Sequence, residues 1–387
     1  MKKIGLLSVY NHNYGSILQA YAMQTVLNNT GSQVEILYYK KTNIFKQAVR
    51  LLYLPLLKAT LKMKWKTLYC RLFQKETFKK ILVSREAVFS EFIHDNMKFS
   101  QVYAGREALI AGTKNYDCFV LGSDQVWNPM NLGGDFYTMT FIPDDKVKIT
   151  YAPSFGVAEI PDRQKAQTKK YLQRIDCISV RESDGVRIVK ELTGRDVQQV
   201  VDPTILVDKA VWDEKKGNRL LEENYILCYF ISANPAYRAF AQKLAKQTGL
   251  KLAVIPHVDE FVKADQNFGD IVPEGVGPFQ FINLISNATY VCTDSFHGSV
   301  FSTLYERPFF TFSRYSGDGA DSTNSRLYSY LKLIAMENRM YQADHEITKV
   351  DLAAPDFTVA KKNLERMRKE SEKYLFSALD SVGVKNA

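Results

Sequence analysis

Residues 293–298 read TDSFHG, and this stretch places His297 directly before a glycine. The run before it, NATYVC, is short, apolar and rich in β-forming residues, whereas the apolar residues between Val300 and Tyr305 recur at helical spacing. His297 is therefore predicted to lie in a strand-to-helix turn. Such a turn presents unpaired backbone N–H groups and the positive end of a helix dipole, which both favour a bound anion. A capping or core histidine fits the same position equally well.

Four other predicted strands also end in a small or flexible residue beside polar groups. Their ends are the segments NHNYGS (11–16), GSDQVWN (122–128), SFG (154–156) and SVRESD (179–184). In open parallel sheets, ligands bind beyond the carboxyl ends of the strands. Each segment alone can be an ordinary turn, but five on one edge indicate a ligand site, where the N–H groups of Gly15 and Ser16 can face an anion.

Arg181 closes the apolar stretch CISV and precedes ESD, which is a helix-start signal. A guanidinium at this strand end can point toward the predicted site and bind a carboxylate or phosphate through two parallel hydrogen bonds. The alternative is a surface ion pair with Glu182 or a nearby aspartate, which would stabilise the fold very little. The residue pattern leaves both interpretations open.

The elements that position these segments alternate between strand-like and helix-like patterns. Such alternation predicts an α/β fold with parallel sheets covered by helices. At 387 residues the chain exceeds the usual size of a single core, so two domains are expected. We place one Rossmann-like domain at 1–205, a second at 206–340 and a helix packing back across both at 341–387, with the site in the cleft between the domains.

Several protein classes are excluded by what the sequence lacks. It contains no GxxxxGK[ST] loop, no HExxH motif, no GxSxG elbow and no GxGxxG fingerprint after the first strand. We therefore expect neither a dinucleotide cofactor nor a metal. The five cysteines lack disulfide or metal-ligand spacing, which fits a reducing cytoplasm, and no stretch approaches the ~20 apolar residues of a membrane span.

The net charge of +9 originates in one segment. Residues 40–85 hold thirteen basic residues and one acid, a local charge of +12, so the rest of the chain sums to −3. Lysines spaced four apart lie on one face of a predicted helix within 43–85, with aromatic and aliphatic residues on another. This pattern is typical of a helix on an anionic membrane, and a solvated helix is the alternative. No nucleic-acid-binding module accompanies the charge, so nucleic acid is not an expected partner.

Taken together, these segments resemble the polysaccharide pyruvyl transferase family. The resemblance rests on NYGSILQAYAMQ, GSDQVWN, SVRE, DPTIL and TDSFHGSVFS with the later RPF, and it spans residues 4–335. It implies a GT-B-like architecture of two domains facing a cleft. It also implies an enzyme that moves pyruvate from phosphoenolpyruvate onto two hydroxyls of a saccharide as a ketal and releases phosphate, without a cofactor, in cell-surface polysaccharide (exopolysaccharide) biosynthesis.

The family's motif arginine falls on Arg181 and its motif histidine on His297. Many members have an arginine two positions before that histidine, where this chain has Ser295. A second positive charge for the phosphate must then come from another residue. The candidates are downstream arginines, with Arg326 first, followed by Arg314 and Arg307.

The resemblance also implies roles for individual residues. His297 would protonate the methylene carbon of phosphoenolpyruvate, since histidine ordinarily titrates near neutral pH, or it would bind the phosphate. Arg181 would hold the donor, and Glu182 or Asp124 would take a proton from an acceptor hydroxyl. The donor-binding candidates are Ser295, Gly298, Ser299, Ser325 and Arg326. The acceptor-binding candidates are Asn13, Tyr14, Gly15, Ser16, Ser123, Gln125 and Trp127.

Two other functions are compatible with the same pattern. A GT-B glycosyltransferase would bind a nucleotide sugar in the same cleft, and a non-catalytic relative would bind sugar alone. For the pyruvyltransferase, the expected partners are phosphoenolpyruvate and a saccharide acceptor, either free or lipid-linked. The expected location is the cytoplasm, or the inner face of the membrane if the segment 40–85 binds anionic lipid.

Overall fold

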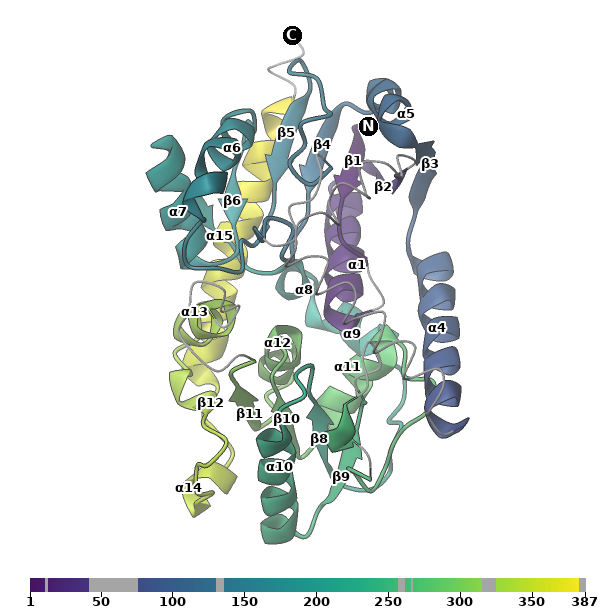
Figure 1. Cartoon of the computed structure of the whole chain (residues 1–387), viewed down its shortest axis with the longest axis vertical. Helices are drawn as coiled ribbons and strands as arrows, with labels where there is room; N and C mark the ends of the chain where they lie inside the picture. Colours follow the sequence, from purple (N-terminus) through teal and green to yellow (C-terminus); the bar gives the residue numbers. More distant parts are fainter. Residues whose placement is uncertain are drawn as a thin grey trace.

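Two parallel sheets form the framework, one in each half of the chain (Figure 1). The first has β1 (Lys3–Leu7), β2 (Gln33–Lys40), β3 (Phe99–Ala104), β4 (Cys118–Leu121) and β5 (Val147–Thr150), in the order β3-β2-β1-β4-β5. The second has β8 (Tyr225–Tyr229), β9 (Lys251–Val254), β10 (Tyr290–Thr293), β11 (Phe309–Phe312) and β12 (Met340–Tyr341), in the order β12-β11-β10-β8-β9. A parallel pair, β6 (Ser179–Val180) and β7 (Gln198–Gln199), continues the first sheet through a bridge between Ile149 and Cys177.

The computed structural model describes residues 1–10, 13–41, 76–129, 136–256, 262–265, 267–314 and 325–382. Helices of the first half are α1 (Tyr14–Asn29), α4 (Glu76–Asn96), α5 (Gly105–Gly112), α6 (Asp162–Gln173) and α7 (Ser183–Thr193). The connection to the second half contains α8 (Pro203–Leu206) and α9 (Lys209–Lys215). Then follow α10 (Pro235–Thr248), α11 (Pro278–Asn287), α12 (Phe296–Leu304), α13 (Ser325–Leu333), α14 (Lys349–Leu352) and α15 (Thr358–Asp380). Short 3₁₀ turns span Thr113–Asn115, Lys263–Asp265 and Glu337–Arg339.

The central strands carry almost no polar alternation. Every residue of β4, β5, β8 and β11 is buried. Strands buried on both faces are characteristic of parallel sheets with helices on each side. The predicted α/β fold with parallel sheets and a C-terminal helix is therefore confirmed.

The two halves share one hydrophobic core, which includes Ile4 of the first sheet and Phe309 of the second. At the start of α1, the Tyr14 ring stacks on Phe281 of α11 with ring centroids 4.7 Å apart. The Tyr14 hydroxyl also donates a hydrogen bond of 2.9 Å to the carbonyl oxygen of Val276. This packing holds the first turn of α1 against the second half.

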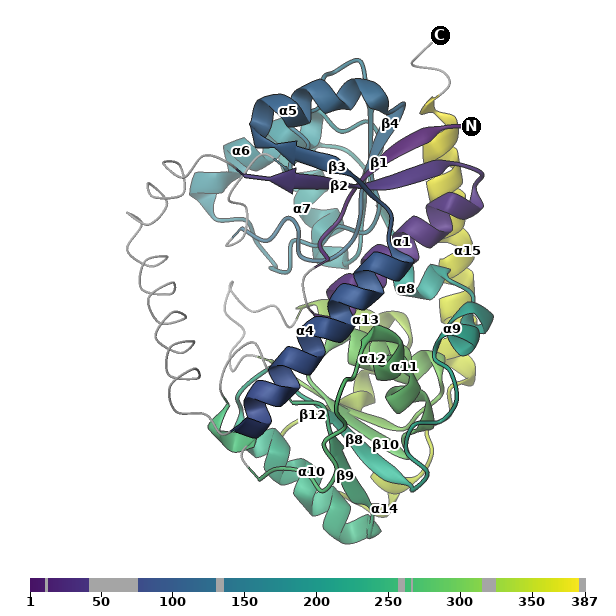
Figure 2. The same ribbon diagram turned by 90° about the vertical axis from the view of Figure 1, so that its right-hand side faces the viewer.

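Helix α15 runs alongside both halves (Figures 1 and 2). The Tyr374 hydroxyl donates to the carbonyl oxygen of Thr150 in β5 at 2.9 Å, and Lys361 pairs with Glu306, after α12, at 3.0 Å. The predicted domain boundary at residue 205 falls within α8. Most of the basic segment predicted at 43–85 lies outside the described residues.

Candidate active site

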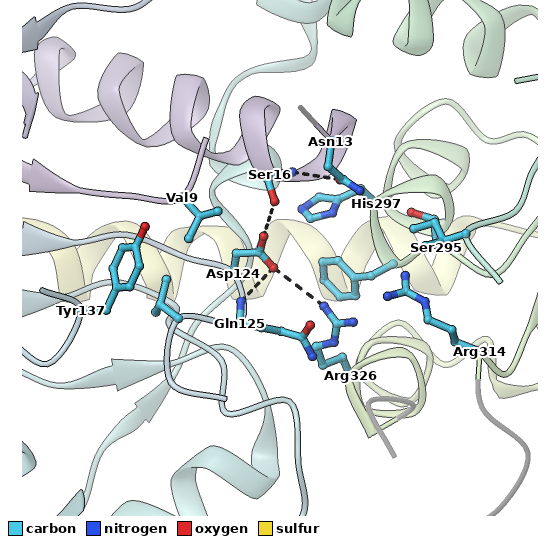
Figure 3. A pocket seen from close by; sticks show the side chains of 13 residues that line it. Val9, Asn13, Ser16, Asp124, Gln125, Tyr137, Ser295, His297, Arg314 and Arg326 are labelled. Carbon is cyan, nitrogen blue, oxygen red and sulfur yellow. Dashed lines mark hydrogen bonds and ion pairs between the residues drawn. The ribbon is translucent and has the colours of Figure 1, made fainter. Parts of the chain in front are cut away.

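A cavity of about 660 Å³ lies between the halves at the carboxyl ends of both sheets. Its lining residues are Val9, Asn13, Ser16, Asp124, Gln125, Val126, Tyr137, Ile231, Ser295, Phe296, His297, Arg314 and Arg326 (Figure 3). Most of them follow strands β1 and β4 of the first sheet or β8 and β10 of the second, where the strand order reverses. Parallel sheets bind ligands at such switch points, and the volume suits a small molecule.

His297 lies in the first turn of α12, directly after β10, as the sequence predicts. Ser295 is the N-cap residue, and its Oγ accepts a hydrogen bond of 3.3 Å from the Gly298 N–H. This cap uses the Gly298 amide that we expected to serve the donor. Ser299 is buried beneath the turn, where its hydroxyl lies 2.8 Å from that of Thr311.

The His297 ring packs against the first turn of α1. A Cβ atom added at Gly15 would lie 2.0 Å from the His297 Nδ1, so a side chain here would displace the imidazole. Asn13 caps the same turn, because its Oδ1 accepts hydrogen bonds from the N–H groups of Gly15 (3.0 Å) and Ser16 (3.4 Å). These N–H groups, expected to face an anion, are therefore used by the cap, and Gly15 makes room for His297.

Asp202 is fully buried behind His297 and accepts several hydrogen bonds. Its Oδ1 accepts hydrogen bonds from the N–H (3.1 Å) and hydroxyl (2.8 Å) of Thr204. Its Oδ2 accepts from Arg181 Nη1 (2.8 Å) and Ser123 Oγ (3.1 Å) and lies 3.5 Å from His297 Nε2. Burial raises the pKa of Asp202, but His297 and Arg181 outweigh burial and hold this pKa well below its ordinary value.

Arg181 lies behind the cavity wall. Its guanidinium carbon is 4.5 Å from the ring centroid of Phe296, which lines the cavity. Its Nε and Nη2 have no hydrogen-bond partner in the described part of the chain, and Glu182 Oε2 and Asp124 Oδ1 each lie 4.0 Å away. The structure thus connects Arg181 to His297 through Asp202, whereas the sequence led us to expect that Arg181 points into the cavity and holds the donor.

Glu182 is committed to the backbone of a neighbouring loop. Its Oε1 accepts hydrogen bonds from the Ser154 hydroxyl (2.9 Å) and from the N–H groups of Phe155 (2.8 Å) and Gly156 (3.2 Å). Glu182 does not line the cavity. Two carboxylates were predicted to take a proton from the acceptor, and of these Asp124 is the one that lines the cavity.

Asp124 lies in the turn that follows β4 and has a positive φ of 78°, a conformation that aspartate tolerates better than most residues. Its Oδ2 accepts a hydrogen bond of 2.5 Å from Ser16 Oγ, and its Oδ1 accepts one of 2.8 Å from the Gln125 N–H. Arg326 Nη1 is 3.9 Å from the same Oδ1 (Figure 3). Burial raises the pKa of Asp124, but the surrounding cations, Arg181 foremost, lower it overall, so the carboxylate stays ionised.

Two arginines of the second half share the cavity wall with His297. Arg326 is buried in the first turn of α13, and Arg314 follows β11. Burial and the guanidiniums of Arg181 and Arg314 lower the pKa of Arg326 to about 9. A bound anion would stabilise the charged form of Arg326 and so counteract both its burial and the repulsion from the other guanidiniums.

Trp127 and Tyr14, predicted to contact the acceptor, are core residues. The Trp127 ring is fully buried and donates its Nε1–H to the carbonyl oxygen of Tyr137 at 3.1 Å. Arg307 lies beyond α12 and donates to the carbonyl oxygen of Tyr305. The candidates that do not line the cavity are Tyr14, Gly15, Ser123, Trp127, Arg181, Glu182, Gly298, Ser299, Arg307 and Ser325.

Asp202 is the main site residue that sequence reasoning missed. It opens the segment DPTIL, and its place between an apolar run and a proline at a helix start was a readable signal for a strand end followed by an N-cap. Phe296 and Tyr137 were also missed, and no spacing rule distinguishes them from core aromatics.

The described residues contain neither a cluster of metal-ligating side chains nor a helix suited to cross a membrane. Within these ranges, no three or more His, Cys, Asp or Glu side chains gather as a metal site would require. None of the helices described combines the length and the apolar character of a membrane span.

Comparison with solved structures shows the fold. A protein from Listeria monocytogenes assigned as a UDP-N-acetylglucosamine 2-epimerase aligns with a TM-score of 0.51 and 10% identity, over 98% of this chain and 96% of that one. The glycosyltransferase SnogD from Streptomyces nogalater aligns with a TM-score of 0.47 and 10% identity, over 100% and 99% of the two chains. At this identity the epimerase supports the GT-B-like architecture alone, and the weaker alignment carries no argument.

Comparison with sequences shows the family. No curated protein matches the chain. The family model described as polysaccharide pyruvyl transferase matches residues 13–316, which is most of the chain and includes every lining residue except Val9 and Arg326. The chain therefore belongs to the polysaccharide pyruvyl transferase family.

Proposed function

We propose that this transferase moves pyruvate from phosphoenolpyruvate onto two hydroxyls of a saccharide as a ketal and releases phosphate, in the synthesis of a cell-surface polysaccharide. The observation that carries the proposal is the arrangement of one cavity wall, which His297, Arg314 and Arg326 of the second half line together. A wall of this kind combines anion binding with a group that can transfer a proton near neutral pH.

The donor suits this wall because it carries both a carboxylate and a phosphate. Arg326 is buried close to other guanidiniums, and this surrounding lowers its pKa to about 9. An anionic donor would reduce that repulsion and desolvation on binding. Arg326 and Arg314 thus take the place of the arginine that many family members have where this chain has Ser295.

The chemistry begins with a proton transfer from His297 to the methylene carbon of phosphoenolpyruvate. The new C–H bond turns that carbon into a methyl group and leaves C2 electron-deficient. One acceptor hydroxyl adds to C2 and loses its proton, and the C2–O bond to phosphate then breaks. The second hydroxyl adds to C2 and loses its proton, so the two hydroxyl protons balance the one gained by carbon and the one taken up by phosphate.

The acceptor lies against the wall of the first half. Tyr137 presents an aromatic ring and Gln125 an amide, and aromatic rings and amides are groups that contact sugars. Asp124 is held ionised by the neighbouring cations, and it accepts the hydrogen bond of the attacking hydroxyl. General acid–base catalysis, with His297 as the acid and Asp124 as the base, contributes about 10²- to 10⁴-fold to the rate.

Phosphate release tests the proposal. The purified protein is incubated with phosphoenolpyruvate and a panel of saccharides, and inorganic phosphate and the product mass are measured. We expect phosphate release that requires an acceptor, a product carrying one pyruvate ketal, and no activity in His297→Ala. Release of a nucleotide from a nucleotide sugar, with phosphoenolpyruvate unchanged, would instead support the glycosyltransferase alternative.

We also propose that the enzyme acts in the cytoplasm and that the segment 40–85 brings it to a lipid-linked acceptor at the inner face of the membrane. The support is the +12 charge of that segment and, among the described cysteines, the unpaired thiols of Cys118, Cys177, Cys228 and Cys292. Co-sedimentation with vesicles tests the membrane contact. Binding that requires anionic lipid and weakens with salt is expected, whereas no binding at low salt would remove this proposal.

A further inference from the structure

A rigidly held carboxylate lies directly behind the cavity histidine. Asp202 is fully buried and does not line the cavity. Both of its oxygens accept hydrogen bonds, Oδ1 from Thr204 and Oδ2 from Arg181 and Ser123. The carboxylate cannot rotate without breaking these bonds, so the oxygen that faces His297 Nε2 at 3.5 Å is fixed in place.

The His297 ring is confined on its other side by Gly15. The Nδ1 atom approaches the Gly15 backbone so closely that a Cβ there would lie 2.0 Å away. The Nε2 atom is buried and points toward Asp202, while the ring as a whole contributes to the cavity wall. The two ring nitrogens thus have different surroundings, one beside a buried carboxylate and one beside the first turn of α1.

We propose that Asp202 is a positioning residue that keeps a proton on His297 Nε2 and leaves Nδ1 to exchange the catalytic proton. The proposal rests on the acid role assigned to His297 above. In a histidine, the hydrogen bond made by one ring nitrogen decides which tautomer is present. When the Nδ1–H bond breaks and the methylene carbon of the donor gains the proton, the neutral ring retains its Nε2–H toward Asp202.

The charges around His297 are consistent with this role. Among the described residues, Asp202 and Asp124 are the carboxylates that interact electrostatically with it, and Arg181 and Arg326 lie beside these two carboxylates. Arg181 donates to Asp202 and keeps it ionised. The Asp202 oxygen nearest the ring is thus an acceptor that faces Nε2.

The test compares two buried carboxylates of similar depth. Asp202→Asn keeps the shape but removes the charge behind His297. The matched control is Asp294→Asn, since Asp294 is also fully buried, one residue before the N-cap Ser295, but its oxygens accept from the N–H groups of Ile231 and Ser232. We expect Asp202→Asn to lower kcat about 10²-fold, within the range that a general acid supplies, with the KM for phosphoenolpyruvate within about twofold of wild type.

A spectroscopic readout separates this inference from the function itself. In ¹⁵N-histidine-labelled protein, with the His297 signal identified by its loss in His297→Gln, the neutral ring should carry its proton on Nε2. Asp202→Asn should shift the ring toward the other tautomer, and Asp294→Asn should not. A wild-type ring protonated on Nδ1 would overturn the proposal even if Asp202→Asn fails to fold. A raised KM at unchanged kcat in Asp202→Asn would also overturn it, whereas inactivity of the wild type would count against the function alone.

Discussion

The two walls of the cavity occupy equivalent places in the two sheets but carry different chemistry. The first half contributes amides, hydroxyls and one carboxylate, from Asn13, Ser16, Asp124, Gln125 and Tyr137. The second half contributes an imidazole and two guanidiniums, from His297, Arg314 and Arg326. This difference is why we propose that the anionic donor binds at the second half and the hydroxyl-bearing acceptor at the first.

The two walls also fit each other. Both begin with a capped helix after a central strand, α1 with Asn13 and α12 with Ser295. Helix α12 projects the His297 imidazole against α1, and α1 can accommodate the ring because Gly15 has no side chain. The shared hydrophobic core holds the two helices in this relation, so each half completes the site of the other.

Removal of the imidazole is expected to have the largest effect. His297→Gln keeps a polar side chain at this position but cannot transfer the proton, so acceptor-dependent phosphate release should fall about 10²- to 10⁴-fold. Thermal unfolding should change little in comparison. Release at the wild-type rate would show that another group is the acid and that the wall of the second half serves binding alone.

Gly15→Ala tests the contact between the two walls. The new Cβ would lie 2.0 Å from Nδ1, so the buried imidazole must move, and we expect kcat to fall about 10- to 100-fold because small misplacements of reacting groups are costly. The matched control is Gly277→Ala, whose Cβ would meet the flexible end of the Gln280 side chain. Equal activity in the two variants would mean that the close approach of α1 is unimportant for catalysis.

Arg326→Gln should weaken binding of the donor and leave binding of the acceptor unchanged. Charge-assisted hydrogen bonds contribute about 1.5–3 kcal/mol, so the KM for phosphoenolpyruvate should rise about 10- to 100-fold at unchanged acceptor KM. Arg307→Gln is the control, because Arg307 lies outside the cavity. A rise in the acceptor KM alone would indicate that the wall of the second half binds the acceptor and not the donor.

The pH dependence of the donor KM sharpens the same assignment. The pKa of Arg326 is lowered to about 9, so its guanidinium is charged below that pH and loses charge above it. Donor affinity should therefore fall as the pH rises through about 9. Steady-state kinetics between pH 7 and 10 should show this rise in KM for the wild type and a flatter curve for Arg326→Gln. Identical pH profiles of the donor KM in the two proteins would mean that a residue other than Arg326 supplies the positive charge.

Gln125→Ala is expected to have the smallest effect. Gln125 lines the cavity, and we expect its amide to contact an oxygen of the acceptor. Loss of one neutral hydrogen bond should raise the acceptor KM about 2- to 10-fold at unchanged donor KM. Acceptor titrations at saturating phosphoenolpyruvate measure this, and an unchanged acceptor KM would place the saccharide elsewhere.

The fold was predictable because local residue patterns indicate the alternation of strands and helices. The strand ends that line the cavity followed from the same patterns, as the position of His297 shows. Arg181 was harder, because the direction of its side chain depends on Phe296 and Asp202, which come from distant segments. Asp202 was missed for the same reason, since its role arises when Arg181 and His297 meet it in three dimensions.

A crystal structure of the protein with bound phosphoenolpyruvate tests the central claim most directly. We predict that the donor lies in the cavity with its anionic groups toward Arg314 and Arg326 and its methylene carbon beside His297. A donor bound instead against Tyr137 and Gln125, or outside the cavity, would contradict the division of roles between the two walls.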